Sequence, residues 1–209
     1  MPPNRRLALE KYQRVATTYD HGAHRFQNAR RRAVALLRLH PGDIVLDVGC
    51  GTGLSFPLIE EAVGTAGPII GIDQSPDMLA KARERIDRAG WQNVTLIRSP
   101  VDEADIAVQA DAALFCFTHD IMQTPQALEN VFQHVRRGGR AAVAGTKWAP
   151  WWASPLNLLV WQIARHAMTT LEGLSHPWRQ FERFVSDLRV EHLLLGTQYV
   201  AWGTVPGGQ

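Results

Sequence analysis

The sequence predicts an α/β fold with a doubly wound, mostly parallel sheet of seven strands, closed by a C-terminal antiparallel hairpin. Three observations predict this fold. Short apolar runs alternate with amphipathic helical patterns from Asp43 to Thr146, which is typical of successive βαβ units. The first apolar run ends in glycines at alternate positions, Gly49, Gly51 and Gly53, as a strand does where its turn lies close to a ligand. Near the end of the chain, two β-rich runs are separated only by Gly196-Thr197, which predicts a hairpin.

Local patterns define each element in order. Pro41-Gly42 breaks the second helix before the first strand, and Pro57 is tolerated in the first turn of the third helix. Ser75 as N-cap and Pro76 at the first position start the fourth helix, and Gly90 ends it. The expected helices span residues 7–19, 25–39, 54–63, 76–89, 125–135 and 156–168. The expected strands span residues 44–48, 69–72, 93–98, 112–117, 140–145, 188–195 and 198–205, with a turn at 137–139 before the fifth.

Composition bounds the class of protein. A chain of 209 residues with 45% apolar and 20% charged residues is typical of one globular domain. No apolar run at the N-terminus resembles a secretion signal, and no run is long enough to span a membrane. The two cysteines, Cys50 and Cys116, lack metal-ligand spacing and lie in or beside predicted strands. We therefore expect buried thiols, no metal site and a cytoplasmic location.

The net charge of +2 hides an asymmetry along the chain. Residues 1–40 hold nine Lys/Arg against two Asp/Glu, including the run Arg30-Arg31-Arg32. A basic N-terminal arm could face nucleic acid or an anionic lipid surface. The alternative is a solvated helix face with some internal ion pairs.

The glycine turn and the acid that follows it predict a nucleotide-containing ligand. Asp73 ends the second strand, twenty residues past Gly53, which is about the spacing at which an acid reaches ribose hydroxyls. The glycines are spaced G-x-G-x-G rather than G-x-G-x-x-G, and Asp47 precedes them by two residues. A diphosphate would be repelled by that carboxylate, whereas a ligand with an ammonium and a sulfonium group would be attracted.

Residues 45–53 resemble motif I of the class I S-adenosylmethionine-dependent methyltransferases, and residues 71–79 resemble the second motif of that family. The resemblance covers about residues 12–146 and implies the Rossmann-like form of the predicted fold. It also implies S-adenosylmethionine as cofactor. The cofactor-binding residues that it implies are Tyr19, Asp47, Gly49, Cys50, Gly51, Gly53, Asp73, Gln74, Met78, Pro100, Val101, Phe115, Cys116 and Phe117. Pro100-Val101 stands where the family usually has Asp-Ala beside the adenine, so Asp102 or Glu103 is expected to replace that contact.

Two residues are candidates for catalysis. His119 follows the fourth strand, at the edge where open α/β sheets hold ligands, and could take a proton from the acceptor. Its alternative role is to order the loop or to hydrogen-bond the cofactor. Tyr19, in a Tyr19-Asp20 pair common in this branch of the family, would lie over the transferable methyl group. Its alternative role is packing at a helix end.

Tryptophans gather after the fifth strand. Residues 147–178 hold five of the seven, and Trp148, Trp151 and Trp152 are expected to line an apolar acceptor pocket. The alternatives are core packing beneath the sheet or a contact in a homodimer. We accordingly divide the single domain, residues 1–209, into an N-terminal helical arm (1–40), a cofactor-binding core (43–146), an acceptor-side insertion (147–187) and a closing hairpin (188–205).

The resemblance implies methyl transfer to a small acceptor, apolar or amphiphilic. Tyr19-Asp20, residues 30–34 and residues 53–55 are also similar to bacterial phospholipid and betaine-lipid N-methyltransferases, which leaves peripheral membrane contact open. A nucleic-acid substrate is disfavoured, because Phe117-Thr118-His119-Asp120 stands where an Asn/Asp-Pro-Pro-Tyr-type motif would follow the fourth strand. The alternative from another class is a non-catalytic cofactor-binding or scaffold protein, which the departure at Pro100-Val101 keeps open.

Overall fold

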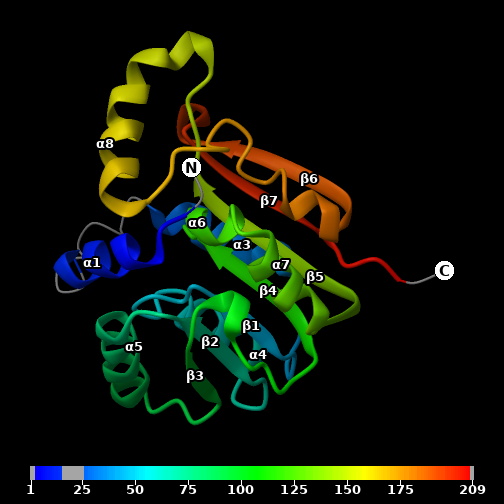
Figure 1. The fold of residues 1–209 in the computed structure, drawn as a ribbon. Helices are drawn as coiled ribbons and strands as arrows, with labels where there is room; N and C mark the ends of the chain where they lie inside the picture. The colour runs from blue at the N-terminus through cyan, green and yellow to red at the C-terminus, as the bar shows by residue number, and fades with distance from the viewer. Residues whose placement is uncertain (1–2, 16–25, 208–209) are drawn as a thin grey trace.

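A computed structural model describes residues 3–15 and 26–207. Its single sheet has seven strands in the order β3-β2-β1-β4-β5-β7-β6 (Figure 1). The strands are β1 (Val45–Val48), β2 (Ile69–Asp73), β3 (Val94–Arg98), β4 (Ala110–Cys116), β5 (Val135–Thr146), β6 (Ser186–Leu193) and β7 (Gln198–Thr204). β1 to β5 pair in parallel, and β7 lies antiparallel between β5 and β6. The predicted fold class is confirmed.

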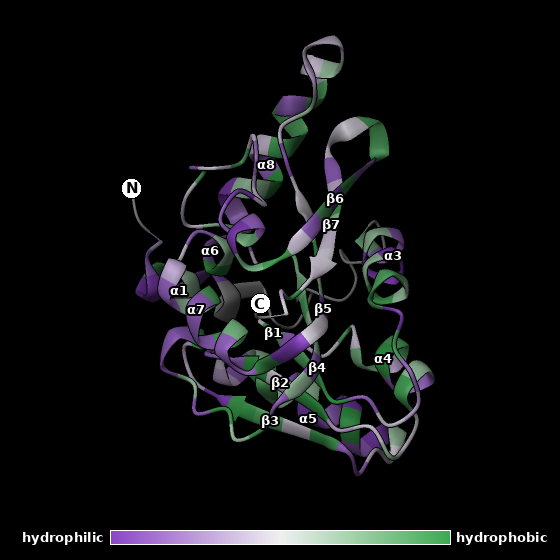
Figure 2. Cartoon of the chain, turned by 90° about the vertical axis from the view of Figure 1, so that its right-hand side faces the viewer, coloured by the Kyte–Doolittle hydropathy of each residue, from purple (hydrophilic) through white to green (hydrophobic). Residues whose placement is uncertain are grey.

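Helices cover both faces of the sheet. The helices are α1 (Arg5–Val15), α3 (Gln27–Leu37), α4 (Phe56–Val63), α5 (Pro76–Ala89), α6 (His119–Met122), α7 (Pro125–Gln133) and α8 (Asn157–Ala167). Alternate residues of β4 point to opposite faces, so Leu114 packs with α3, α4 and α5 while Phe115 packs with α7. Figure 2 shows the mainly hydrophilic colouring of α1, which lies at the carboxyl ends of the strands and not against a face of the sheet.

The predicted caps are present. Ser75 lies at the N-cap of α5 and its hydroxyl accepts from the N–H of Met78 at 3.4 Å, while Gly90 ends the helix with φ of +72°. Pro57 lies in the first turn of α4 as predicted. These signals are local, and the structure follows them closely.

Three predicted boundaries are wrong. The turn at 137–139 is an excursion within β5, because Gly138 donates to the carbonyl of Val205 and Gly139 accepts from the N–H of Val205. The hairpin turns earlier than expected, through a 3₁₀ turn (Leu194–Gly196), so β6 ends at Leu193. β4 begins at Ala110, two residues before the predicted start. In each case long-range strand pairing overrides a local signal.

The N-terminal helix is tied to a distant part of the chain. The Lys11 ammonium donates to the carbonyls of Arg165 and Met168, and the Asn4 N–H donates to the Thr169 hydroxyl at 2.9 Å. The C-terminal end of α8 therefore contacts α1 beyond the carboxyl ends of the strands (Figure 1). Residues 16–19 of the expected first helix, with Tyr19, lie outside the described residues.

Candidate functional site

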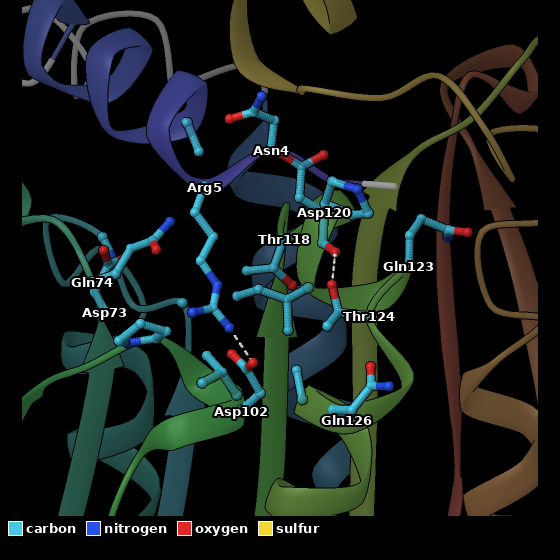
Figure 3. A pocket seen from close by; sticks show the side chains of 18 of the residues that line it. Asn4, Arg5, Asp73, Gln74, Asp102, Thr118, Asp120, Gln123, Thr124 and Gln126 are labelled. Atoms are coloured by element: carbon cyan, nitrogen blue, oxygen red, sulfur yellow. Dashed lines mark hydrogen bonds and ion pairs between the residues drawn. The ribbon is translucent and has the colours of Figure 1, made fainter. Parts of the chain in front are cut away.

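A cavity of about 390 Å³ opens at the carboxyl ends of β1, β2 and β4, a volume typical of small-molecule sites. The strand order reverses there, because β1 connects to β2 on one side and pairs with β4 on the other. Figure 3 shows side chains from α1, from the ends of β2 and β3, and from the segment after β4 pointing into it. The lining residues are Pro3, Asn4, Arg5, Ala8, Gly49, Gly51, Asp73, Gln74, Met78, Pro100, Val101, Asp102, Cys116, Phe117, Thr118, Asp120, Ile121, Gln123, Thr124, Pro125, Gln126 and Ala127.

The glycine turn after β1 forms one wall. Gly51 has φ of +55°, and a Cβ added there would have no heavy atom within 4 Å, so a side chain would extend into open space at the cavity. A Cβ on Gly49 would lie 2.5 Å from Thr118 Cγ2 and 2.8 Å from Ile121 Cδ1. Gly51 thus leaves room for a ligand, and Gly49 lets the segment after β4 pack against the turn.

Asp73 ends β2 beside the turn. One carboxylate oxygen accepts from the N–H of Gly51 at 2.9 Å, and the other accepts from the N–H of Ser75 at 2.8 Å. Burial raises the pKa of this carboxyl, and the backbone hydrogen bonds of Ser75, Gly51 and Gln74 act in the opposite direction. Each oxygen keeps a further lone pair, so Asp73 can accept two hydrogen bonds from vicinal hydroxyls of a ligand.

The end of β3 meets the N-terminal helix. Pro100 and Val101 line the cavity as predicted, and Asp102 lies beside them. The Arg5 guanidinium extends from α1 across the mouth of the cavity and pairs with Asp102 and Glu103 (Figure 3). The two carboxylates expected to replace an adenine contact are therefore both engaged with Arg5 in this structure.

A buried charge cluster lies under the glycine turn. Asp47 is 1% exposed, and burial raises its pKa to about 7, although the Arg30 guanidinium and the Ser55 hydroxyl lower it. Arg30 is itself buried, with its carbon Cζ 5.8 Å from the centre of the Phe117 ring. Its Nε and Nη1 have no hydrogen-bond partner in the described part of the chain. Asp47 supports the turn from below and does not line the cavity.

The basic run Arg30-Arg31-Arg32 does not form a free cationic face. Arg30 is buried, and Arg32 pairs with Glu191 of β6 at 2.8 Å. The run therefore cannot present three free cations to an anionic surface. Helical periodicity turns one arginine toward the sheet, and strand β6 neutralises another.

The wall opposite the glycine turn is polar. Asp120 accepts from the backbone N–H and the hydroxyl of Thr169, and its own carbonyl accepts from the Thr124 hydroxyl at 2.9 Å. Figure 3 shows Gln123 and Gln126 beside this pair. Asp120, Gln123, Thr124 and Gln126 line the cavity although no sequence pattern predicts them as lining residues. The predicted helix start at Thr124-Pro125 was the available signal, because it placed this segment at the carboxyl edge of the sheet.

His119 does not line the main cavity. It lies on a separate small void with Met168 and Tyr199, and its Nε2 lies 3.0 Å from the carbonyl oxygen of Glu172. Since a carbonyl only accepts, Nε2 carries the proton and donates. Burial lowers the pKa of His119, against the opposing charge of Asp120. This geometry matches the loop-ordering alternative for His119.

The tryptophans expected in an acceptor pocket do not line this cavity either. Trp151 and Trp152 are 86% and 58% exposed, and Trp148 packs beside the small cluster of α8. Residues 151–156 form a 3₁₀ helix, in agreement with the expectation that this segment is no regular α-helix. Pro155 and the non-helical angles of Ala153 interrupt this segment.

Some predicted cofactor residues lie behind the cavity wall. Gly53 packs against Phe56, since an added Cβ would lie 2.6 Å from that ring. Cys50 points beneath the turn toward Gly71, and Phe115 is in the core. The structure brings together nine of the predicted residues: Gly49, Gly51, Asp73, Gln74, Met78, Pro100, Val101, Cys116 and Phe117. Tyr19 lies outside the described residues.

Neither a metal centre nor a membrane span emerges from the described ranges, residues 3–15 and 26–207. They contain no group of three or more His, Cys, Asp or Glu side chains arranged to hold a metal ion. None of their helices is both long enough and apolar enough to cross a bilayer. Burial raises the pKa values of the two thiols, Cys50 and Cys116, and both are free.

Comparisons with known proteins point to one family. Residues 39–172 match a family described as a methyltransferase domain. The chain is 28% identical over 112 residues to an arsenite methyltransferase of Halobacterium salinarum, covering 53% of this chain and 29% of that protein. It is 32% identical over 120 residues to a phosphatidylethanolamine N-methyltransferase of Cereibacter sphaeroides, covering 56% of this chain and 57% of that protein. The chain thus spans well under two thirds of the length of these curated relatives.

A solved structure shares the fold. The N-methyltransferase NodS from Bradyrhizobium japonicum WM9, in complex with S-adenosyl-L-homocysteine, superposes with a TM-score of 0.72 at 13% identity. The superposition covers 96% of this chain and 99% of that one. At this identity the likeness concerns the fold alone.

Proposed function

This chain belongs to the methyltransferase-domain family, and we propose that it transfers the methyl group of S-adenosylmethionine to a small apolar or amphiphilic acceptor. One observation carries the proposal. Gly51, which leaves open space, and Asp73, which keeps free lone pairs, line one side of the cavity. The polar residues of the segment after β4 line the same cavity. One cavity can therefore hold a nucleoside-bearing cofactor on one side and an acceptor on the other.

The residues present fit S-adenosylmethionine. The space left by Gly51 is a cradle that a Cβ would fill, and Asp73 offers two acceptors to the ribose hydroxyls. Gln74 and Met78 flank the same end, with Pro100 and Val101 across from them. When bound, the cofactor supplies an electrophilic methyl group on a sulfonium.

The protein's contribution to such a transfer is alignment and exclusion of water. α1 covers the mouth of the cavity with Asn4, Arg5 and Ala8, and its bonds to Thr169 and Met168 hold it there. The polar wall of Asp120, Gln123, Thr124 and Gln126 would orient a hydrogen-bonding head group of the acceptor. Ile121 and Ala127 beside these residues would contact its apolar part.

We infer that His119 supplies no base to this reaction. Its Nε2–H is directed at the Glu172 carbonyl, and its ring lies on the far side of the cavity wall. A neutral amine needs no base to attack a sulfonium methyl group. The acceptors that this geometry favours are therefore nucleophiles that react without deprotonation by His119.

A lipid amine is the second candidate acceptor. The similarity to a phosphatidylethanolamine N-methyltransferase supports it, as do the exposed aromatic side chains of residues 151–152. A non-catalytic role in cofactor binding remains the alternative of another class. The departure at Pro100-Val101 no longer favours it, because both residues line the cavity without obstructing it.

The direct test is a methyl-transfer assay with S-adenosylmethionine labelled in its methyl group. The acceptors are phosphatidylethanolamine, a quinol, a phenol and a primary amine, and Asp73→Asn, assayed at a cofactor concentration well below the wild-type Kd, is the control with weakened cofactor binding. We expect label to enter an organic-extractable product with the wild type, and to enter it at least about tenfold more slowly with the variant at that cofactor concentration. Cofactor binding without label transfer to any of these acceptors would favour the non-catalytic role.

A further inference from the structure

Exposed apolar side chains gather on a segment that the proposed chemistry does not use. They lie on the 3₁₀ helix that precedes α8, on the first turn of α8, and on the turn between β6 and β7. We call these residues the Trp–Leu patch: Trp151, Trp152, Leu158, Leu159, Leu194 and Leu195, all between 49% and 86% exposed. Figure 2 shows the hydrophobic colour of the β6–β7 turn at the outer end of the hairpin.

The two segments of the patch meet at their bases. A Cβ added to Gly196 would lie 2.8 Å from Pro150 Cδ, so the hairpin turn touches the residue before Trp151. The Lys147 ammonium donates to the carbonyls of Trp148 and Gly196, which ties both segments together. The two segments are therefore joined at their bases, although they are about 40 residues apart in sequence.

Stability does not explain the leucines of the hairpin turn. Leu194 and Leu195 have φ of +47° and +55°, in the left-handed region where a Cβ meets the following carbonyl. Both side chains are 62% exposed, so little hydrophobic burial offsets the strain of these two residues. Asparagine or glycine would suit both positions better, which points to a role for the leucines outside the folded chain itself.

The charge around the patch is of one sign. Residues 147–171 contain Lys147, Arg165 and His166 and no Asp or Glu, and residues 193–198 carry no charge. The Arg165 guanidinium lies 4.7 Å from the centre of the Trp161 ring. The nearest carboxylate in sequence to the hairpin turn, Glu191, is paired with Arg32 at 2.8 Å. Exposed tryptophans and leucines on segments whose charged side chains are basic are complementary to anionic head groups above a hydrocarbon layer.

The patch is connected to the covering of the cavity through α8, whose first turn carries Leu158 and Leu159 and whose last turn contacts α1. Lys11 of α1 donates to the carbonyl of Arg165 at the end of α8, and α1 lines the cavity through Asn4, Arg5 and Ala8. We propose that the Trp–Leu patch binds the surface of an anionic lipid bilayer and so brings α1 and the cavity mouth to that surface. The inference that the acceptor comes from the bilayer rests on the proposed function, whereas the docking itself does not.

The test is sedimentation of the full chain with vesicles of phosphatidylglycerol and phosphatidylcholine in equal amounts, against vesicles of phosphatidylcholine alone. We expect binding to the anionic vesicles only, weakened by salt, with a blue shift of tryptophan emission. L194N/L195N should weaken binding by about tenfold or more, since each leucine loses its insertion into hydrocarbon. R165Q should weaken it by about fivefold, the value of one basic side chain near an anionic surface.

Two controls keep the test decisive. R137Q removes an exposed arginine from the excursion within β5, at the opposite end of the sheet, and should bind vesicles like the wild type. L194N/L195N removes strain, so its melting temperature should not fall, and loss of binding cannot be attributed to unfolding. Calorimetry with S-adenosylhomocysteine on the same variants reports separately on the proposed function.

Failure of the wild type to sediment with anionic vesicles, or equal binding by L194N/L195N, would overturn the proposal. A concentration-dependent dimer in sedimentation velocity that the same variant abolishes would also overturn it, because the patch would then be an interface between two copies.

Discussion

Backbone groups form most of one side of the cavity, and side chains form most of the other. The side made by β1 and β2 consists of backbone, glycine and buried charge: Gly49 and Gly51 at positive φ, Asp73 held by two amides, and Asp47 beneath the turn. The opposite side consists of side chains joined across long stretches of sequence, as in the bonds of Asp120 to Thr169 and of Asn4 to Thr169.

This difference indicates which side of the cavity binds an invariant ligand and which side selects the acceptor. On the glycine side a single added carbon would occupy ligand space, so that side suits one invariant ligand. On the other side, amide and hydroxyl side chains can be exchanged without moving the backbone, so that side suits a variable acceptor. Substitutions should therefore have large effects on cofactor affinity on the first side and small ones on the second.

The largest expected effect is that of Gly51→Val. A β-branched side chain at φ of +55° would occupy the cradle and strain the turn, so affinity for S-adenosylhomocysteine should fall by about 100-fold or more. Gly42→Val is the matched control, because Gly42 also has positive φ and no atoms near an added Cβ but lies away from the cavity. Calorimetry should find the control's affinity unchanged. Equal losses in both variants would show that strain alone matters.

Asp73→Asn should have the next largest effect on affinity. One amide hydrogen-bond donor would replace an acceptor that faces backbone N–H groups and ligand hydroxyls, at a cost of about 1.5–3 kcal/mol. Asp77→Asn, on the exposed first turn of α5, is the control and should bind normally. An affinity of Asp73→Asn within the error of the wild type would remove Asp73 from the site.

Asp47 should make stability depend on pH in an unusual direction. Burial raises its pKa to about 7, against about 3.9 in an unfolded chain, so the folded state binds the extra proton between these values. The free energy of unfolding should fall as pH rises through that window, by up to about 1.4 kcal/mol per pH unit. Denaturant titrations should show that the free energy of unfolding of Asp47→Asn lacks this trend. Relative to the wild type, the variant should become more stable as the pH approaches neutrality. If the free energies of unfolding of the two proteins changed in parallel with pH, the raised pKa of Asp47 would be wrong.

The smallest effect on the cofactor is expected from His119→Gln, on the other side of the cavity. Glutamine can still donate to the Glu172 carbonyl, so stability should change by about 1 kcal/mol or less at neutral pH. Burial lowers the pKa of His119, so the wild type should lose stability as pH falls below about 6.5, and the variant should lose less. A turnover loss of about 100-fold with intact affinity would restore His119 as a general base.

The same contrast explains what the sequence could predict. Ser75, Gly90 and the glycine turn act through neighbours a few residues away, so their elements and nine lining residues follow from local patterns. Arg5 reaches Asp102 across the cavity, and His119 is turned by Glu172, contacts that no local pattern encodes. Trp151 and Trp152 are expected at an acceptor pocket from their place between the fifth strand and the hairpin, but both are exposed on a 3₁₀ helix whose path no local pattern specifies. Local signals therefore predict the glycine side of the cavity, which we propose for the cofactor, and only the three-dimensional structure reveals the opposite side, which we propose for the acceptor.

The most direct test of the central claim is a calorimetric titration of the wild type with S-adenosylhomocysteine, repeated in the presence of NADH. We expect one saturable site per chain that NADH does not block, and an affinity for S-adenosylhomocysteine that is lower by about 100-fold or more in Gly51→Val. Tighter binding of NADH, or no binding of S-adenosylhomocysteine by folded wild type, would contradict it.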